Sequence, residues 1–172
     1  YERALFDDKA RKSQVRMSET RLKKIATLKS KLTSGRSNSN MANDLFQYAL
    51  AQWQETKYQH LLAMEAYDKA VACWAETRCP DKPEVPVGDY NVSVSTFLRI
   101  LRDHPTYRRL DEVMYHLGQA ALEVGRRDGD DALQKKGIQQ LNSLLKMFPK
   151  SKHVAAVHLA KGDFFQELDS LS

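Results

Sequence analysis

The feature that most constrains this chain is an internal repeat at a fixed offset of 44 residues. The offset aligns two prolines, two glycines and several apolar and acidic positions: Pro105 with Pro149, Gly118 with Gly162, Ile100 and Leu101 with Leu144 and Leu145, Val113 with Val157, and Glu123 with Glu167. A weaker copy lies at an offset of 68, where three positions match: Phe46, Trp53 and Glu55 with Met114, Ala121 and Glu123. Tandem units bury their apolar faces only against their neighbours, so the repeat predicts a solenoid.

Apolar residues recur at helical spacing along most of the sequence. Only seven Gly and five Pro interrupt 172 residues, which leaves long stretches free to form helix. After a helix within residues 1–36, we expect helices at about 41–55, 58–77, 90–104, 108–125, 130–147 and 152–169. Trp53 and Trp74 are expected to be largely buried between the helices at 41–55 and 58–77. The loop at 34–40 ends in Asn40, which is suited to cap the next helix. Three Pro within seven residues make 78–90 an irregular loop. The other connections are short, so the chain is predicted to be all-α, with successive helices paired as antiparallel hairpins.

Positive charge is concentrated in the first 36 residues, which hold eleven Lys/Arg and four Asp/Glu, a net charge of +7. The remaining 136 residues carry a net charge of −2, so the whole chain carries +5. This asymmetry either marks a segment that binds an anionic partner, nucleic acid or acidic lipid, or is a solvated helix face. No aromatic residue interleaves the charges from Lys9 to Arg36, so a nucleic-acid partner is not favoured. We therefore divide the chain into a basic N-terminal helix, 1–36, and a repeat region, 41–169.

Two cysteines, Cys73 and Cys79, have five residues between them. This spacing matches no zinc or haem motif. Pro80 turns the chain just after Cys79, so the two either form a small disulfide in an oxidising compartment or remain two unlinked thiols.

The repeat resembles the tetratricopeptide repeat (TPR), a helix W-x2-L-G-x2-Y followed by a helix A-x3-F and a Pro eight residues later. The matching segments are Met114-x2-Leu117-Gly118-x2-Ala121, then Gly137-x3-Leu141 with Pro149, Ser93-x3-Phe97 with Pro105, and His158-x2-Lys161-Gly162-x2-Phe165. The resemblance implies a short TPR-like solenoid of about three units over 41–169. The small Gly118 and Gly162 are expected at close helix contacts. The departures from the consensus, including about seven extra residues around 126–131, weaken the case for a peptide-binding TPR of the chaperone-docking kind.

The segments 97–125 and 141–167 look most like divergent TPR units of bacterial envelope proteins, of the Tol-Pal coordinator and outer-membrane assembly lipoprotein type. The segment 45–71 is similar to TPR proteins of gliding-motility machinery. The resemblance implies a periplasmic location in the cell envelope and envelope proteins as partners. Because the sequence opens at Tyr1, we expect that a signal peptide or an outer-membrane lipid anchor could have been lost before it.

The sequence contains no recognisable catalytic motif: G-x-S-x-G, the P-loop, G-x-G-x-x-G and H-E-x-x-H are all missing. His153 and His158 stand about 140° apart around a helix, so they cannot share a metal on one face. The acidic run at 128–131 lacks the closing Glu of a calcium loop, and Asp130 or Asp131 is expected to cap the next helix. We therefore expect no enzyme activity, no cofactor, no metal and no small-molecule substrate.

In TPR proteins the first helices of successive units form the inner, protein-binding face. Carried over to this sequence, that face is acidic and rich in amides, and its side chains are expected to turn away from the partner helix. It comprises Asp44, Gln47, Gln54 and Glu55, then Glu112, Tyr115, Gln119 and Glu123, then Asp163, Gln166 and Glu167. The alternative is an ordinary solvated surface.

The last predicted helix, 152–169, matches the first helix of a repeat, with no second helix to cover Phe164, Phe165 and Leu168. Uncapped repeats leave apolar surface in water. We therefore expect this edge to bind a partner protein or a second copy, or to continue into a longer solenoid. Together these features favour a non-enzymatic TPR-like scaffold of an envelope complex, with motility machinery as its narrowest form. The alternative function is nucleic-acid or acidic-lipid binding through the N-terminal helix.

Overall fold

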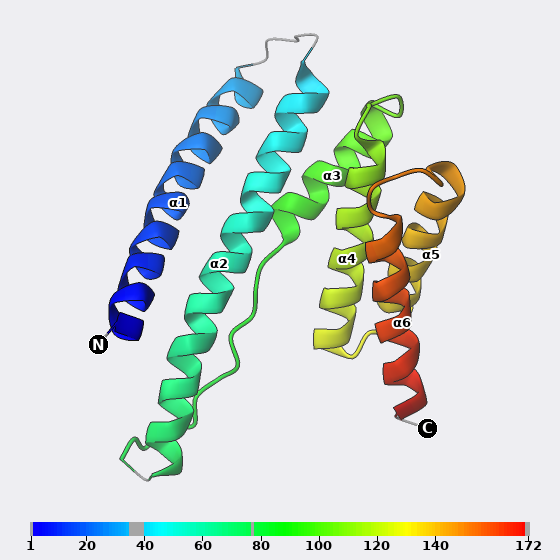
Figure 1. Cartoon of the computed structure of the whole chain (residues 1–172). Helices are drawn as coiled ribbons and strands as arrows, with labels where there is room; N and C mark the ends of the chain where they lie inside the picture. The colour runs from blue at the N-terminus through cyan, green and yellow to red at the C-terminus, as the bar shows by residue number, and fades with distance from the viewer. Residues whose placement is uncertain (1, 35–39, 77, 171–172) are drawn as a thin grey trace. The chain divides into compact units, whose positions relative to one another are not determined.

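The computed structural model describes residues 2–34, 40–76 and 78–170, and within them the surroundings of side chains from residue 9 to residue 166. All regular secondary structure in these ranges is α-helical, which confirms the all-α prediction (Figure 1). The stacking of the helices as a TPR-like solenoid stays a prediction. None of the helices in the described ranges combines the length and the apolar character that crossing a bilayer needs. The chain forms two compact units, Tyr1–Ser93 and Val94–Ser172. The predicted junction at residues 36–41 falls within the first unit.

The first unit is built on an antiparallel hairpin of two long helices, α1 (Glu2–Thr33) and α2 (Met41–Ala75) (Figure 1). The prediction of two helices, 41–55 and 58–77, is wrong, because α2 runs through Lys57 and Tyr58 without a break. No Gly or Pro lies between residues 41 and 75, so nothing in this segment stops a helix once it has started.

The core of the first unit lies along the first half of α2, where Leu45, Phe46, Ala49 and Trp53 are buried. The Pro-rich loop runs back beside α2 (Figure 1), and its last residue, Tyr90, places its ring 4.5 Å from that of Trp53. The irregular loop is thus confirmed, and so is the burial of Trp53.

The far end of α2 is less well covered. Trp74, predicted to be buried, is 41% exposed. Cys73 and Cys79, whose state the sequence left open, form a disulfide with a Cα–Cα distance of 5.4 Å. This bond ties the last turn of α2 to the start of the loop. At the other end of α2, Asn40 precedes the helix, but its side chain makes no capping hydrogen bond, so that prediction is wrong.

The second unit contains most of α3 (Asn91–Asp103), then α4 (Leu110–Asp128), α5 (Asp131–Met147) and α6 (Val154–Ser170). The predicted bounds agree to within three residues. Its fully buried side chains come from all four helices: Phe97, Ile100, Val113, Leu141, Leu144 and Val157. The apolar stripes of α4, α5 and α6 share one core, and Leu101 of α3 packs against it.

Glycine allows α4 and α5 to approach closely. A Cβ atom at Gly118 would lie 2.4 Å from Leu141 Cδ2, and one at Gly137 would lie 2.9 Å from the Gly118 carbonyl oxygen. The expectation for Gly118 is confirmed. The expectation for Gly162 is wrong, because among the described atoms nothing lies within 4 Å of a Cβ built there.

The connection from α4 to α5 is a two-residue turn. Gly129 ends α4 in the left-handed conformation at φ 66°, which favours glycine. Asp130 then caps α5 by accepting a hydrogen bond from the Leu133 N–H at 2.9 Å. Of the two predicted caps, Asp130 and Asp131, the first is therefore confirmed. Both devices are local and short, so α4 and α5 pair as a hairpin.

The 44-residue offset also relates the backbone hydrogen bonds of the two Pro-marked turns. Around Pro105 the N–H of residues 104, 107, 110 and 113 bonds to the carbonyl of residues 100, 104, 107 and 109. Around Pro149 the N–H of residues 148, 151, 154 and 157 bonds to the carbonyl of residues 144, 148, 151 and 153. Each bond in the first set has its partner in the second at the same offset. The α3–α4 and α5–α6 connections are therefore the same turn made twice.

Candidate protein-interaction surface

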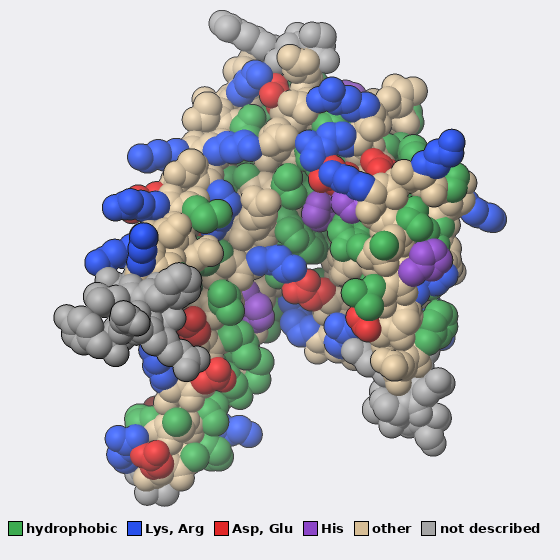
Figure 2. Space-filling view, in the orientation of Figure 1, with side chains coloured by type: hydrophobic (Ala, Val, Ile, Leu, Met, Phe, Trp, Pro, Cys, Tyr) green, Lys and Arg blue, Asp and Glu red, His purple; other side chains and the backbone are tan. Residues whose placement is uncertain are grey.

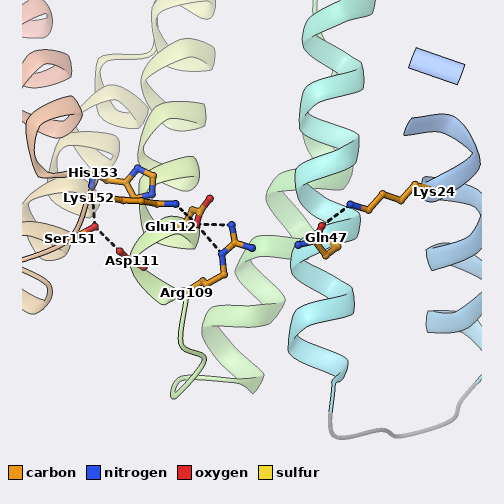
Figure 3. Close-up of polar contacts among 8 residues, drawn as sticks. All are labelled: Lys24, Gln47, Arg109, Asp111, Glu112, Ser151, Lys152 and His153. Atoms are coloured by element: carbon orange, nitrogen blue, oxygen red, sulfur yellow. Dashed lines mark hydrogen bonds and ion pairs between the residues drawn. The ribbon is translucent and has the colours of Figure 1, made fainter. Parts of the chain in front are cut away.

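A cluster of polar side chains forms where the second of these turns meets the start of α4 (Figure 3). We call it the repeat-turn cluster, and it comprises Arg109, Asp111, Glu112, Tyr115, Ser151, Lys152 and His153. Of these, Arg109 immediately precedes α4, and Ser151 to His153 lie in the turn before α6. The aligned Pro-marked turns thus bring residues about 40 positions apart into contact.

Glu112 is the centre of the cluster and is only 8% exposed. Its Oε2 accepts a hydrogen bond from Arg109 Nε at 2.9 Å and lies 3.3 Å from Lys152 Nζ. Burial alone raises the pKa of Glu112, but the hydrogen bond and charge of Arg109, with those of Lys152, outweigh it and hold the pKa below its usual value. Glu112 is therefore a carboxylate neutralised by two cations.

A second link crosses the cluster at its edge. Ser151 Oγ donates to Asp111 Oδ2 at 2.5 Å, and it accepts from the His153 N–H at 3.2 Å. One hydroxyl thereby caps the turn before α6 and binds it to the first turn of α4. This is the capping use of serine extended to a neighbouring helix.

His153 stacks on Tyr115 with ring centroids 4.6 Å apart and an interplanar angle of 16°. Its Nε2 is buried and has no hydrogen-bond partner. Burial lowers the pKa of His153, and the nearby charges of Glu112 and Asp111 oppose that shift without reversing it. The ring is therefore favoured in its neutral form and acts as a packing surface.

The first unit holds a comparable arrangement along α1 and α2, which we call the polar seam. It comprises Ser18, Arg21, Lys24 and Lys31 on α1 and Asp44, Gln47 and Glu55 on α2. Glu55 is 5% exposed and accepts from Ser18 Oγ at 2.6 Å, from Arg21 Nε at 3.0 Å and from Gln59 Nε2 at 2.7 Å. Burial opposes the shift, but these hydrogen bonds hold the pKa of Glu55 below its usual value.

The two remaining acceptors of the polar seam lie nearer the start of α2. Lys31 Nζ is 2.6 Å from Asp44 Oδ2, and Lys24 Nζ donates to Gln47 Oε1 at 2.6 Å (Figure 3). The expectation that Asp44, Gln47 and Glu55 turn away from the partner helix is therefore wrong. The partner of α2 is α1, and these side chains face its basic residues.

The other predicted surface residues have different positions. Gln54, Asp163 and Gln166 are exposed, whereas Tyr115, Gln119 and Glu123 are half-buried on α4. The expectation of an exposed side chain is wrong for Glu112, which the repeat-turn cluster buries. The role of these residues in protein binding stays a prediction.

The predicted apolar edge of α6 is smaller than expected. Phe164 is 6% exposed and packs in a cluster with Met114, Leu141 and Val157. The expectation for Phe164 is wrong because the preceding helices cover this face of α6. Phe165 is 51% exposed, as predicted. Leu168, like Glu167, lies outside the described side chains.

Sequence reasoning missed Arg109, Asp111, Ser151, Lys152 and His153. A signal was present, because the 44-residue offset aligns Arg109 with His153 and Tyr107 with Ser151, just after the two aligned prolines. The repeat was used to find apolar positions, whereas turns of consecutive units also place their polar residues close together.

Chemically, the repeat-turn cluster and the polar seam bind helices to one another. Glu55, Asp44 and Glu112 are already paired with cations, and no three His, Cys, Asp or Glu of the described residues gather as a metal site. What remains for a partner is the half-buried side of α4 and the exposed ends of the cations, since Lys152 keeps a side chain 68% exposed.

No protein-family model, curated protein or solved structure matches this chain.

Proposed function

We propose that the chain is a non-enzymatic, TPR-like helical-repeat scaffold that organises proteins of a bacterial cell-envelope complex. The observation that carries the proposal is the turn made twice at an offset of 44 residues, with the same backbone hydrogen bonds. Ile100 with Leu144, and Val113 with Val157, are buried in both copies. Arrays of equivalent helical units serve widely as extended protein-binding surfaces.

The surface most suited to a partner is the side of α4 that carries Tyr115, Gln119 and Glu123. These side chains are half-buried, and they lie on a helix that Gly118 and Leu141 fix firmly against α5. A polar surface on a rigid helix loses little conformational entropy when a partner binds. Tyr115 adds an aromatic side chain of the kind that is enriched at protein interfaces.

The proposed compartment is supported by the Cys73–Cys79 disulfide. Disulfides persist in oxidising compartments such as the bacterial periplasm and are rare in the cytosol. Together with the resemblance of the repeats to envelope TPR units, this bond favours the periplasmic side of the envelope.

Site-specific photo-crosslinking in living cells tests the proposal. A benzophenone amino acid at Gln119 is expected to crosslink to one or a few discrete envelope proteins. The matched control carries it at Gln139, which is exposed on α5, and is expected to give none of these products. Absence of discrete products from position 119, or the same products from both positions, would contradict the scaffold proposal.

A further inference from the structure

The side of α1 that faces away from α2 carries a second surface with its own chemistry. Lys9, Arg16 and Lys23 follow one another at intervals of seven residues, and all three are exposed. Seven residues advance a helix by about 700°, nearly two turns, so these three side chains form one line along α1. In Figure 2, Lys and Arg side chains gather along this helix.

This line is distinct from the basic residues that α2 already binds. Arg21, Lys24 and Lys31 contact Glu55, Gln47 and Asp44, and Arg11 lies 3.6 Å from Glu65. The basic residues of α1 therefore divide into a set that binds α2 and a set on the other side. Glu19 is the only acidic residue between Lys9 and Thr33. Helix geometry places it on the outward side beside Arg16 and Lys23, so the three cations of the line outnumber the one acid beside them.

Apolar side chains lie beside the basic line. Val15 is 45% exposed and Leu22 is 50% exposed, and they too are seven residues apart. Helix geometry places the Val15–Leu22 line about 100° from the Lys9–Arg16–Lys23 line. The next position on the Val15–Leu22 line, seven residues after Leu22, is the cationic Lys29. The outward side of α1 thus presents two exposed apolar residues flanked by cations.

We infer that this side of α1 lies on an anionic phospholipid surface, with its cations at the headgroup phosphates and Val15 and Leu22 inserted among the upper acyl carbons. Helices that bind in the plane of a membrane interface combine apolar side chains with Lys and Arg in this way. Between Lys9 and Lys29 the helix offers about 30 Å of such surface.

A lipid surface fits the composition of this side better than nucleic acid does. Phosphates of a nucleic acid would pair with the cations but leave Val15 and Leu22 in water. No aromatic residue lies between Lys9 and Ser34, so there is none to stack on a base. A bilayer interface accommodates both the charges and the aliphatic side chains.

Vesicle binding tests the inference. The chain is expected to cosediment with vesicles of equal parts phosphatidylglycerol and phosphatidylcholine and not with pure phosphatidylcholine. Each basic residue near an anionic membrane contributes about a fivefold gain in binding. The triple variant Lys9→Gln/Arg16→Gln/Lys23→Gln is therefore expected to bind the anionic vesicles about a hundredfold more weakly.

Two further variants make the test specific. The control Lys135→Gln/Lys136→Gln/Lys146→Gln removes the same charge from exposed lysines of α5 and is expected to bind like the parent. Val15→Ser/Leu22→Ser keeps every charge and is expected to lose at least about tenfold, because it removes the apolar insertion. Far-UV circular dichroism of each variant serves as the check that it remains helical.

The inference is overturned if neutral and anionic vesicles bind equally, or if the α5 control loses as much as the α1 variant. It is also overturned if the Val15→Ser/Leu22→Ser variant binds vesicles like the parent. Fluorescence anisotropy with a DNA duplex would then show whether the Lys9–Arg16–Lys23 line binds phosphates in general. The inference rests on α1 alone and not on the scaffold proposal. A failed crosslink at Gln119 therefore leaves it standing, and a failed vesicle assay leaves the scaffold proposal standing.

Discussion

The α1–α2 hairpin and the α4–α5 pair are both antiparallel helix pairs, but different kinds of side chain join their helices. Along α1 and α2 the contacts are long polar side chains, with Arg21 and Ser18 on Glu55 and Lys31 on Asp44. Between α4 and α5 they are a leucine and two glycines, Leu141, Gly118 and Gly137. The first pair thus adds buried charge to an apolar core, whereas the close approach of the second depends on the small volume of its glycines.

The two regions can be followed separately in one sample. Both tryptophans, Trp53 and Trp74, belong to the first unit. Their emission therefore reports the α1–α2 hairpin, while far-UV circular dichroism reports the helices of both units. A variant in the second unit should change the circular dichroism transition more than the emission transition.

The largest expected effect comes from adding volume between α4 and α5. Gly118→Leu should lower the free energy of unfolding of the second unit by about 3 kcal/mol, since even a Cβ atom there would meet Leu141. Urea unfolding followed by circular dichroism measures the loss.

Gly162→Leu is the matched control, because its position in the repeat is the same but the space beside it is open. It should be neutral or gain up to about 1 kcal/mol from better helix propensity. A Gly118→Leu variant that unfolds at the parent's urea concentration would show that volume does not hold this pair.

The next effect comes from removing one cation of the polar seam. Arg21→Met leaves the buried Glu55 carboxylate without its charge partner and should cost about 2 kcal/mol, seen as an earlier tryptophan transition in urea. The double variant Arg21→Met/Glu55→Leu should recover most of the loss, because two apolar groups pack where an ion pair was. Equal loss in both variants would mean that Arg21 acts through packing alone.

A smaller effect is expected from acid. Glu55 and Glu112 both have a pKa below the usual value of 4.5, so their stabilisation is present above that pH and is lost as pH falls through the lowered pKa. The melting temperature of the parent should fall below about pH 4.5 more steeply than that of Glu55→Gln or Glu112→Gln. Parallel curves for parent and variants would contradict the role given to these carboxylates.

The smallest effect is expected at the exposed end of the polar seam. Lys31 is 48% exposed, although its partner Asp44 is nearly buried. Solvent screens such a pair, so Lys31→Ala should cost only about 0.5 kcal/mol by tryptophan emission in urea. A loss as large as that of Arg21→Met would show that the exposure of a cation does not determine how much its ion pair in the polar seam contributes to stability.

Local signals in the sequence predicted much of the second unit. Pro105, Pro149 and the acidic turn at Asp130 stop or start helices by their own backbone chemistry, and the structure confirms those boundaries. The same reasoning failed in α2, where a break was predicted at Lys57–Tyr58 from the apolar spacing alone. Without Gly or Pro, no local force ends a helix there.

The candidate surface was less predictable than the fold. Glu112 was found as a residue of a helix face, but one of its two cation partners is Lys152, 40 residues away. Asp44 and Glu55 were expected on an inner face because the likeness to a repeat treated α2 as the first helix of a unit. Whether a polar residue faces water or another helix depends on which helix is its neighbour.

By itself, then, the sequence determined the all-α composition, the position of the Pro-marked turns, the repeat that makes one turn twice, and the close approach at Gly118. These follow from backbone chemistry and periodicity, which act over a few residues. Only the tertiary structure decided that α1 binds the acids of α2, that Phe164 is covered while Gly162 lies open, and that Glu112 meets Lys152. Such contacts join residues far apart in the chain, and each side chain's burial depends on a neighbour that its local pattern does not specify.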